Sequence, residues 1–178
     1  DKDLTFNPRI YADDKFIMQS EYRQAFQKSN LISDFSFNND GKNTNSHLFA
    51  KLDGDINSST KFNFKFQDVS NDDYLKIHNL SNSTPLIENE SLLTTQLDIA
   101  KNIDENTNLD TSFTVFEDLS KKDSDRFQYV LPSFTFSKNL MIPENYNGNF
   151  SFISSGFQKN YDTNIYESLL INDFLFES

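Results

Sequence analysis

Two histidines, His47 and His78, are the residues best suited to metal binding in this sequence, which contains no cysteine. A protein metal site normally needs three or four convergent ligands, and two isolated histidines do not supply them. Serine and aspartate also occur, yet no serine lies in a nucleophile-elbow motif and no glycine-rich loop could cradle a phosphate. We therefore expect no catalytic residues, no metal site and no cofactor, and we interpret the chain as not being an enzyme.

Acidic residues at two places could in principle hold a cation. Asp53 and Asp55 lack the spacing of a calcium-binding loop, so we expect them to face a watery lumen. Asp72 and Asp73 precede Tyr74 and could form a cation or lipid-headgroup site. A turn with solvated carboxylates is the favoured interpretation of that triplet.

Strict alternation of side-chain character predicts β-strands for most of the chain. Between Lys61 and Gln67, three phenylalanines fall on one side of an extended chain, and lysine, asparagine and glutamine fall on the other. Residues 48–56 repeat the pattern, and Asn57 to Thr60 is a short polar turn, so the two runs predict a hairpin. Similar runs recur to the end of the sequence, which predicts about ten strands and no helix of ordinary length.

Turn-forming residues and one proline punctuate the predicted strands. The pairs Asp13-Asp14 and Asp40-Gly41 each predict a turn, while residues 72–89 form a longer, irregular connection. The apolar phase shifts by one residue across Pro132. That shift predicts a bulge or a kink at the proline.

Composition and charge narrow the classes of function. The 178 residues are 36% hydrophobic and include 19 phenylalanines and 7 tyrosines, which argues against a disordered chain. A formal charge of -11, with lysines and arginines scattered singly, argues against a nucleic-acid partner. No run is long and apolar enough for a membrane-spanning helix, and residues 1–20 lack the layout of a signal peptide. An exported protein of this sequence would be a processed or partial product.

Two environments produce this alternation. In a soluble antiparallel sandwich the apolar faces pack together, whereas in an outer-membrane barrel they meet lipid and the polar faces line water. Frequent phenylalanine, little glycine and several long strands favour the barrel. The fold class we predict is therefore an all-β, antiparallel, up-and-down transmembrane β-barrel. The alternatives are another outer-membrane barrel, such as a porin or receptor, and a soluble antiparallel β adhesin or carbohydrate-binding module.

Four short blocks follow one another along the sequence, namely Asn7–Tyr11 with Glu21–Arg23, Ser46–Lys51, Phe66–Leu75 and Tyr129–Pro132. In the same order they resemble blocks in the barrel domain of the LptD (Imp/OstA) family, which assembles lipopolysaccharide in the outer membrane. The resemblance covers most of residues 4–137.

The resemblance implies a function, a location and partners. Residues 1–178 would form part of an LptD-like barrel domain that transports lipopolysaccharide to the outer leaflet of the cell outer membrane. The implied partners are lipopolysaccharide, outer-membrane lipid, an LptE-like plug lipoprotein and a periplasmic LptA-like bridge. The bridge would act through a jelly-roll domain that this chain lacks, as it lacks the family's cysteines, so the chain is expected to be a fragment.

The resemblance also suggests roles for individual residues. Pro8 matches a proline in the strands beside the family's lateral gate, although an edge-strand proline explains the residue equally well. Five charged residues are expected to face the lumen, where they either contact lipopolysaccharide sugars and phosphates or only hydrate the channel. They are Glu21, Arg23, Lys51, Lys61 and Lys65.

Overall fold

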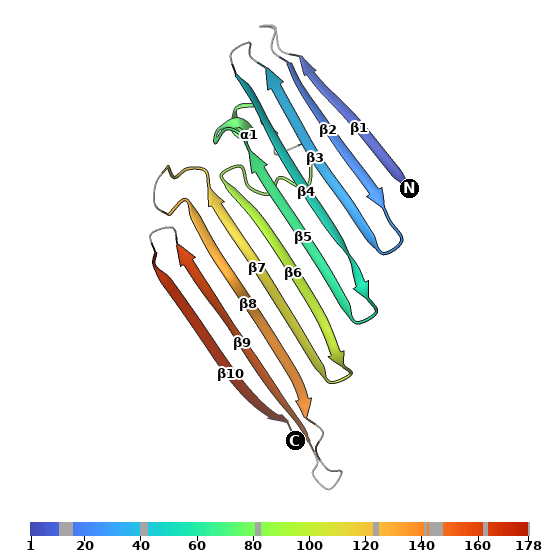
Figure 1. Ribbon diagram of the computed structural model, residues 1–178, viewed down its shortest axis with the longest axis vertical. Coiled ribbons are helices and arrows are strands. Elements are labelled where there is room, and N and C mark those ends of the chain that lie inside the picture. The colour runs from blue at the N-terminus through green and yellow to red at the C-terminus, as the bar shows by residue number, and fades with distance from the viewer. Residues whose placement is uncertain are drawn as a thin grey trace.

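The alternating runs form one antiparallel sheet in which each strand pairs with the next along the chain, in the order β1 to β10 (Figure 1). The computed structural model describes residues 1–10, 16–39, 43–80, 83–122, 125–140, 142, 148–161 and 164–177. The strands are β1 Lys2–Ile10, β2 Phe16–Ala25, β3 Ser29–Asn39, β4 Thr44–Asn57, β5 Thr60–Val69, β6 Leu92–Asp104, β7 Thr107–Asp118, β8 Phe127–Leu140, β9 Asn149–Tyr161 and β10 Tyr166–Glu177. The helix α1, Tyr74–Ile77, has only four residues.

The predicted all-β, up-and-down antiparallel fold is confirmed, including the hairpin around residue 58. The strands β4 and β5 pair from His47–Val69 to Asn57–Thr60, and the Asn57 side-chain oxygen accepts a hydrogen bond of 2.9 Å from the Ser59 amide. The turns predicted at Asp13-Asp14 and Asp40-Gly41 lie outside the described residues. Within the described residues, β1 and β10 are the two edges of the sheet and do not pair, so the sheet is not closed.

Cross-strand register assigns every side chain to one of two faces, because directly opposed residues point the same way. The apolar face carries pairs such as Phe35–Leu48, Leu52–Phe64 and Leu97–Phe113. The polar face carries pairs such as Gln19–Ser36, Ser36–His47 and Asp98–Ser112. The alternation in the sequence therefore becomes a real difference between two surfaces.

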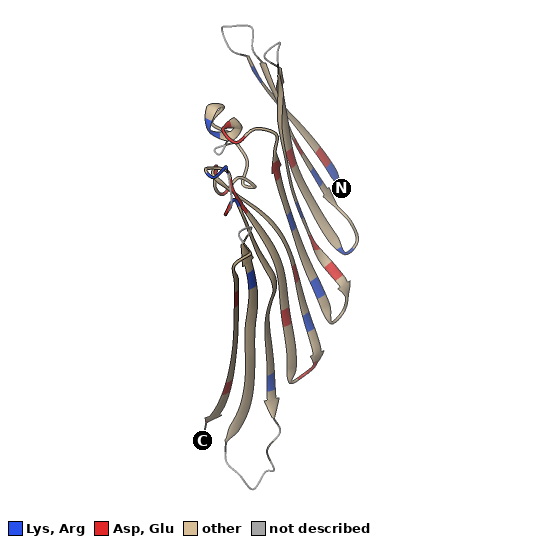
Figure 2. Cartoon of the chain, turned by 60° about the vertical axis from the view of Figure 1, so that its left-hand side comes forward, with Lys and Arg blue, Asp and Glu red and all other residues tan. Residues whose placement is uncertain are grey.

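Only the polar face is covered by another segment in the described part of the chain. The covering segment is the β5–β6 insert, defined here as residues 70–80 and 83–91, which lies on one side of the sheet (Figure 2). Its helix α1 contacts β4. The apolar face is bare, and Phe6 and Phe174 are 59% and 65% exposed. A soluble sandwich would bury this face rather than the polar one.

The phase shift predicted at Pro132 is confirmed as a bulge. The β7–β8 register shifts between Ser112 and Thr114, and the β8–β9 register shifts between Val130 and Ser133. Because of this shift, Tyr129 and Phe134 lie on the same apolar face despite their odd spacing. No helix in the described part of the chain is long and apolar enough to span a membrane.

Candidate functional site: the polar face and its insert

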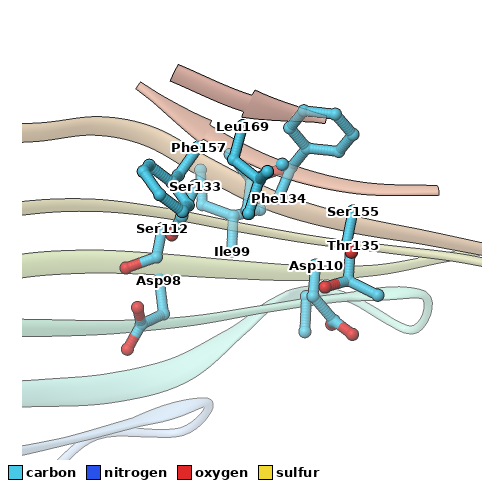
Figure 3. A pocket seen from close by; sticks show the side chains of 13 residues that line it. Asp98, Ile99, Asp110, Ser112, Ser133, Phe134, Thr135, Ser155, Phe157 and Leu169 are labelled. Carbon is cyan, nitrogen blue, oxygen red and sulfur yellow. The ribbon is translucent and has the colours of Figure 1, made fainter. Parts of the chain in front are cut away.

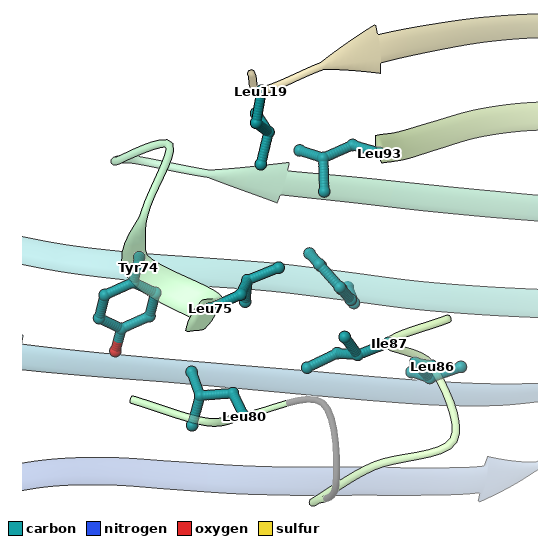
Figure 4. Packing of buried hydrophobic residues seen from close by; sticks show 8 residues of the cluster. Tyr74, Leu75, Leu80, Leu86, Ile87, Leu93 and Leu119 are labelled. Carbon is teal, nitrogen blue, oxygen red and sulfur yellow. The ribbon is translucent and has the colours of Figure 1, made fainter. Parts of the chain in front are cut away.

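The β5–β6 insert is attached to the sheet by the largest buried cluster among the described residues. Its apolar side chains, among them Tyr74, Leu75 and Leu80, pack in one cluster with Leu93 and Leu119 (Figure 4). The partly buried Ile32 and Val69 pack against this cluster. Burying a side chain of this size stabilises a fold by about 1.5–3 kcal/mol, so the insert is firmly docked. The cluster comprises Phe49, Tyr74, Leu75, Leu80, Leu86, Ile87, Leu93 and Leu119.

A buried chain of polar side chains lies beside this cluster. The Nε2 of His47 is 2.5 Å from Oδ1 of Asp34, and its Nδ1 is 2.7 Å from Oγ of Ser36. The Tyr74 hydroxyl is 2.8 Å from the same Ser36 oxygen. With a neutral imidazole each donor has an acceptor, since Tyr74 donates to Ser36, Ser36 to His47 and His47 to Asp34. All four residues are at most 2% exposed.

Gln19 extends this network to the far part of the insert. Its side-chain amide donates to both carboxylate oxygens of Asp34, at 3.1 and 3.2 Å, and to Oγ of Ser83 at 2.8 Å. Ser83 in turn donates to the carbonyl oxygen of Leu80. Buried polar groups of this kind hold a structure in one arrangement, because breaking one bond leaves its partner unsatisfied.

Aspartate, histidine and serine in mutual contact are also the parts of a hydrolase triad. Here the Ser36 oxygen is covered by Tyr74 and lies beneath the insert, so a substrate carbonyl has no approach to it in this arrangement. The network therefore ties the insert to the sheet. The interpretation that the chain is not an enzyme stays a prediction.

Two arginines from distant parts of the chain contact the first half of the insert. Arg9 of β1 donates to the carbonyl oxygen of His78 at 3.1 Å. Arg126, just before β8, donates to both carboxylate oxygens of Asp72, at 2.7 and 3.0 Å, and to Glu117 at 2.8 Å. These contacts hold the pKa of Asp72 below its ordinary value and raise the pKa of Arg126. The insert is thus held from both sides, by Arg9 of β1 and by Arg126 just before β8.

The five charged residues predicted to face a lumen all lie on the polar face, although no contact shows what they bind. Lys51 and Lys65 are directly opposed, and Lys65 bonds Glu88 of the insert at 2.8 Å. Lys61 lies opposite Asp55, in a different part of the same face. Arg23 pairs with its neighbour Glu21 at 2.5 Å. The structure therefore places them on one surface but does not gather them into one site.

Pro8 lies opposite Met18 in β1, which is an edge strand of the described sheet. Its side chain is on the apolar face, next in line to Phe6 and Ile10. Both explanations of this proline, a gate element and an edge-strand proline, fit the position. The gate role stays a prediction.

Two open troughs mark the part of the polar face that the insert leaves uncovered. The first has a volume of about 400 Å³ and runs across β6 to β10, where carboxylates such as Asp98 and Asp110 line it together with the apolar Phe157 and Leu169 (Figure 3). The second, of about 580 Å³, lies across β3 to β6 and shares Asp98 with the first. Among the described residues, no group of three or more histidine, aspartate or glutamate side chains could hold a metal ion.

The turn expected at Asp72 to Tyr74 forms at Asp72-Asp73, but the expectation of solvated carboxylates is wrong for one of the two. Asp73 is exposed as expected, but Asp72 is clamped by Arg126 and Tyr74 is buried in the cluster. His47, considered only as a metal ligand, is instead part of the buried network. Pairing of β3 with β4 sets Ser36 opposite His47, but nothing local in the sequence indicates that Tyr74 completes the contact.

Together the fold and the site define a single-layer antiparallel sheet with a bare apolar face and a plugged polar face. A scan against protein-family models finds no match for the sequence, and a search of curated proteins finds none either.

Proposed function

We propose that this chain is part of the wall of an outer-membrane β-barrel of the LptD-like type, which carries lipopolysaccharide to the outer leaflet without catalysing a covalent change. In this proposal the apolar face contacts lipid and the polar face lines the lumen. The insert then lies inside the lumen as part of a plug. Closure of the barrel requires strands beyond the two edges β1 and β10.

One observation carries the proposal, namely that the insert covers the polar face and leaves the phenylalanine-bearing face bare. In water, burial of apolar surface is the dominant favourable term in folding, so a segment of 20 residues or so should dock on the apolar face. The insert docks on the opposite face instead. This choice is expected if hydrocarbon, rather than protein, covers the apolar face.

The lengths of strands and turns agree with a membrane wall. A strand crossing a bilayer needs about 9–11 residues, and the ten described strands have between 9 and 14. The turns after β4 and β6 have two residues each, while the insert lies at the opposite end of the sheet (Figure 1). Two-residue turns at one end and a long segment at the other are typical of neighbouring strands in outer-membrane barrels, although the connection from β8 to β9, residues 141–148, is longer.

The substrate is tested most sharply at two adjacent residues that point to opposite faces. A photoreactive amino acid at Lys61 samples the polar face, and one at Phe62 samples the apolar face. In intact cells we expect Lys61 to cross-link to lipopolysaccharide only while new lipopolysaccharide is being delivered. Phe62 should cross-link to membrane lipid whether or not delivery continues. No lipopolysaccharide adduct at Lys61 during active delivery would contradict transport, while lipid adducts at Phe62 would still support a barrel of another kind.

A further inference from the structure

The weakest junction in the described sheet lies between β5 and β6, where the insert leaves and rejoins the strands. These strands pair over six residues each, from Thr60–Lys101 to Lys65–Gln96, whereas every other ladder in the described sheet has at least nine pairs. Beyond the Lys65–Gln96 pair, on the side of the insert, residues 66–69 of β5 and residues 92–95 of β6 are not paired. The sheet therefore contains a fork with its open end toward the insert.

The side chain of Gln67 bridges this fork. Its amide nitrogen donates to the carbonyl oxygen of Leu86 at 2.8 Å, and its oxygen accepts from the Thr94 amide at 2.8 Å. The Thr94 amide would bond to β5 if the ladder continued, so the insert and one side chain replace the missing strand contacts. Backbone groups left without such partners would be costly in a buried setting.

The insert lies between the two strands as well as on top of them. By register Leu93 belongs to the apolar face, in line with Leu97 and Ile99, yet it is 2% exposed and packs in the insert cluster. Phe49 of the same cluster belongs to the polar face. A cluster that joins side chains from both faces must pass through the fork.

We propose that the insert is a removable wedge, and that this part of the sheet has two arrangements. With the wedge docked, β5 and β6 are forked as described. With the wedge released, β5 and β6 extend their ladder in the same register, which sets Phe66 opposite Thr95 and Val69 opposite Leu92. The four added residue pairs replace the partners that the insert supplied, which makes the second arrangement a defined state rather than local unfolding.

Release would uncover the part of the polar face that lies beneath the insert. Any consequence for lipopolysaccharide passage rests on the proposed function. The two arrangements of β5 and β6 do not depend on that function. Besides the apolar cluster, the polar contacts that keep the insert docked include the buried network at Tyr74 and the half-buried ion pair between Arg126 and Asp72. Weakening either contact shifts the balance toward the extended ladder by the free energy that the contact contributes.

Paired cysteines in the intact protein test this inference. Val69→Cys/Leu92→Cys reports the extended ladder, and Phe64→Cys/Leu97→Cys, already opposed in the structure, reports that the sheet is folded. We expect the first pair to oxidise slowly in the otherwise unchanged protein and at least tenfold faster when Tyr74→Ala is added. The exposed neighbour change Ile77→Ala should leave the rate unchanged, because Ile77 is 70% exposed.

An off-register pair separates an extended ladder from simple fraying. Asp68→Cys/Leu92→Cys places the two thiols on opposite faces of the extended ladder, so it should stay slow. Equal rates with and without Tyr74→Ala, or equal acceleration of both pairs, would overturn the wedge. If Tyr74→Ala also abolishes oxidation of the Phe64/Leu97 pair, the sheet no longer folds in that variant. Arg126→Gln is then used in place of Tyr74→Ala. We expect it to accelerate oxidation of the Val69/Leu92 pair by a smaller factor, and the same two outcomes would overturn the wedge. These rates report strand pairing alone, so they stand whether or not Lys61 cross-links to lipopolysaccharide.

Discussion

The polar face differs between its two ends although the sequence pattern is the same in both. Beneath the insert, in the covered half formed by the parts of β2 to β5 nearest the insert, polar side chains such as Asp34 and His47 are buried and bonded to one another. In the open half formed by β8 to β10, Ser155 lines an open trough and Asp173 is exposed. Alternation therefore fixes which way a side chain points, but tertiary packing decides whether it becomes structural or stays accessible.

The open half also carries apolar residues on its polar face. Leu169, Ile171 and Leu175 of β10 point to that side and are between 43% and 51% exposed. In the covered half, the corresponding apolar residues Ile32 and Phe49 are packed against the insert. The covered half thus contains the core of the described chain, and stability should depend on it far more than on the open half.

The largest effect is expected where a buried acceptor is removed. Asp34→Ala leaves His47 and Gln19 without their shared acceptor and should reduce the free energy of unfolding by about 3–6 kcal/mol, because each hydrogen bond to a charged carboxylate contributes about 1.5–3 kcal/mol. Asp173→Ala, on the same face of exposed β10, should change it by less than about 0.5 kcal/mol. Urea unfolding of the protein folded in micelles measures both changes. Equal losses for the two variants would mean that the halves do not differ.

The apolar cluster gives the next effect. Leu75 is fully buried, so Leu75→Ala should reduce the free energy of unfolding by about 2–5 kcal/mol. Leu175→Ala removes the same atoms from a residue that is 51% exposed and should have a small effect. The same unfolding measurement applies. A larger loss of unfolding free energy for Leu175→Ala than for Leu75→Ala would mean that the open half, not the covered half, contains the core.

A smaller difference is expected for two serines. Ser36→Ala leaves the Nδ1 of His47 and the hydroxyl of Tyr74 without their shared partner and should cost about 1–3 kcal/mol of unfolding free energy. Ser155→Ala alters a hydroxyl that lines the open trough and should leave stability unchanged. If Ser36→Ala were neutral, the buried chain of hydrogen bonds would not hold the insert.

The smallest expected effect is a dependence of the unfolding free energy on acidic pH. Because Arg126 lowers the pKa of folded Asp72, this pair contributes stability above the unfolded pKa of an aspartate, about 3.9, and loses it as the pH falls through the folded value. Asp72→Asn should therefore cost up to about 1 kcal/mol at pH 7 and progressively less below pH 4. Asp73→Asn, at the exposed neighbour, should show no such trend. A loss for Asp72→Asn that is independent of pH would exclude the ion pair as its cause.

Much of the sheet could be predicted from the sequence because strand pairing in a meander depends on local signals. Alternation at Lys61–Gln67, the polar turn at Asn57 and the phase change at Pro132 all act over a few residues. The insert could not be predicted in this way. Tyr74 meets Ser36 across 38 positions, and Arg126 meets Asp72 across 54, so only the folded chain brings them together.

The sequence predicted on which face of the sheet the candidate site residues lie, but not which residues they contact. Lys51, Lys61 and Lys65 could be assigned to the polar side because side chains on a strand alternate. Which of them the insert would reach depended on the path of a segment with no repeating pattern. Lys65 bonds Glu88, whereas Lys51 is exposed.

Accessibility along one regular strand tests most directly whether the bare apolar face meets hydrocarbon. Spin labels placed singly from Leu109 to Val115 of β7, with the protein in lipid bilayers, compare collision with oxygen, which dissolves in lipid, and with a water-soluble nickel complex. The account predicts a period of two residues, with Leu109, Thr111, Phe113 and Val115 favouring oxygen and Asp110, Ser112 and Thr114 favouring nickel. Equal access of nickel to both sets, or protection of Phe113 from both reagents by a second protein layer, would contradict it.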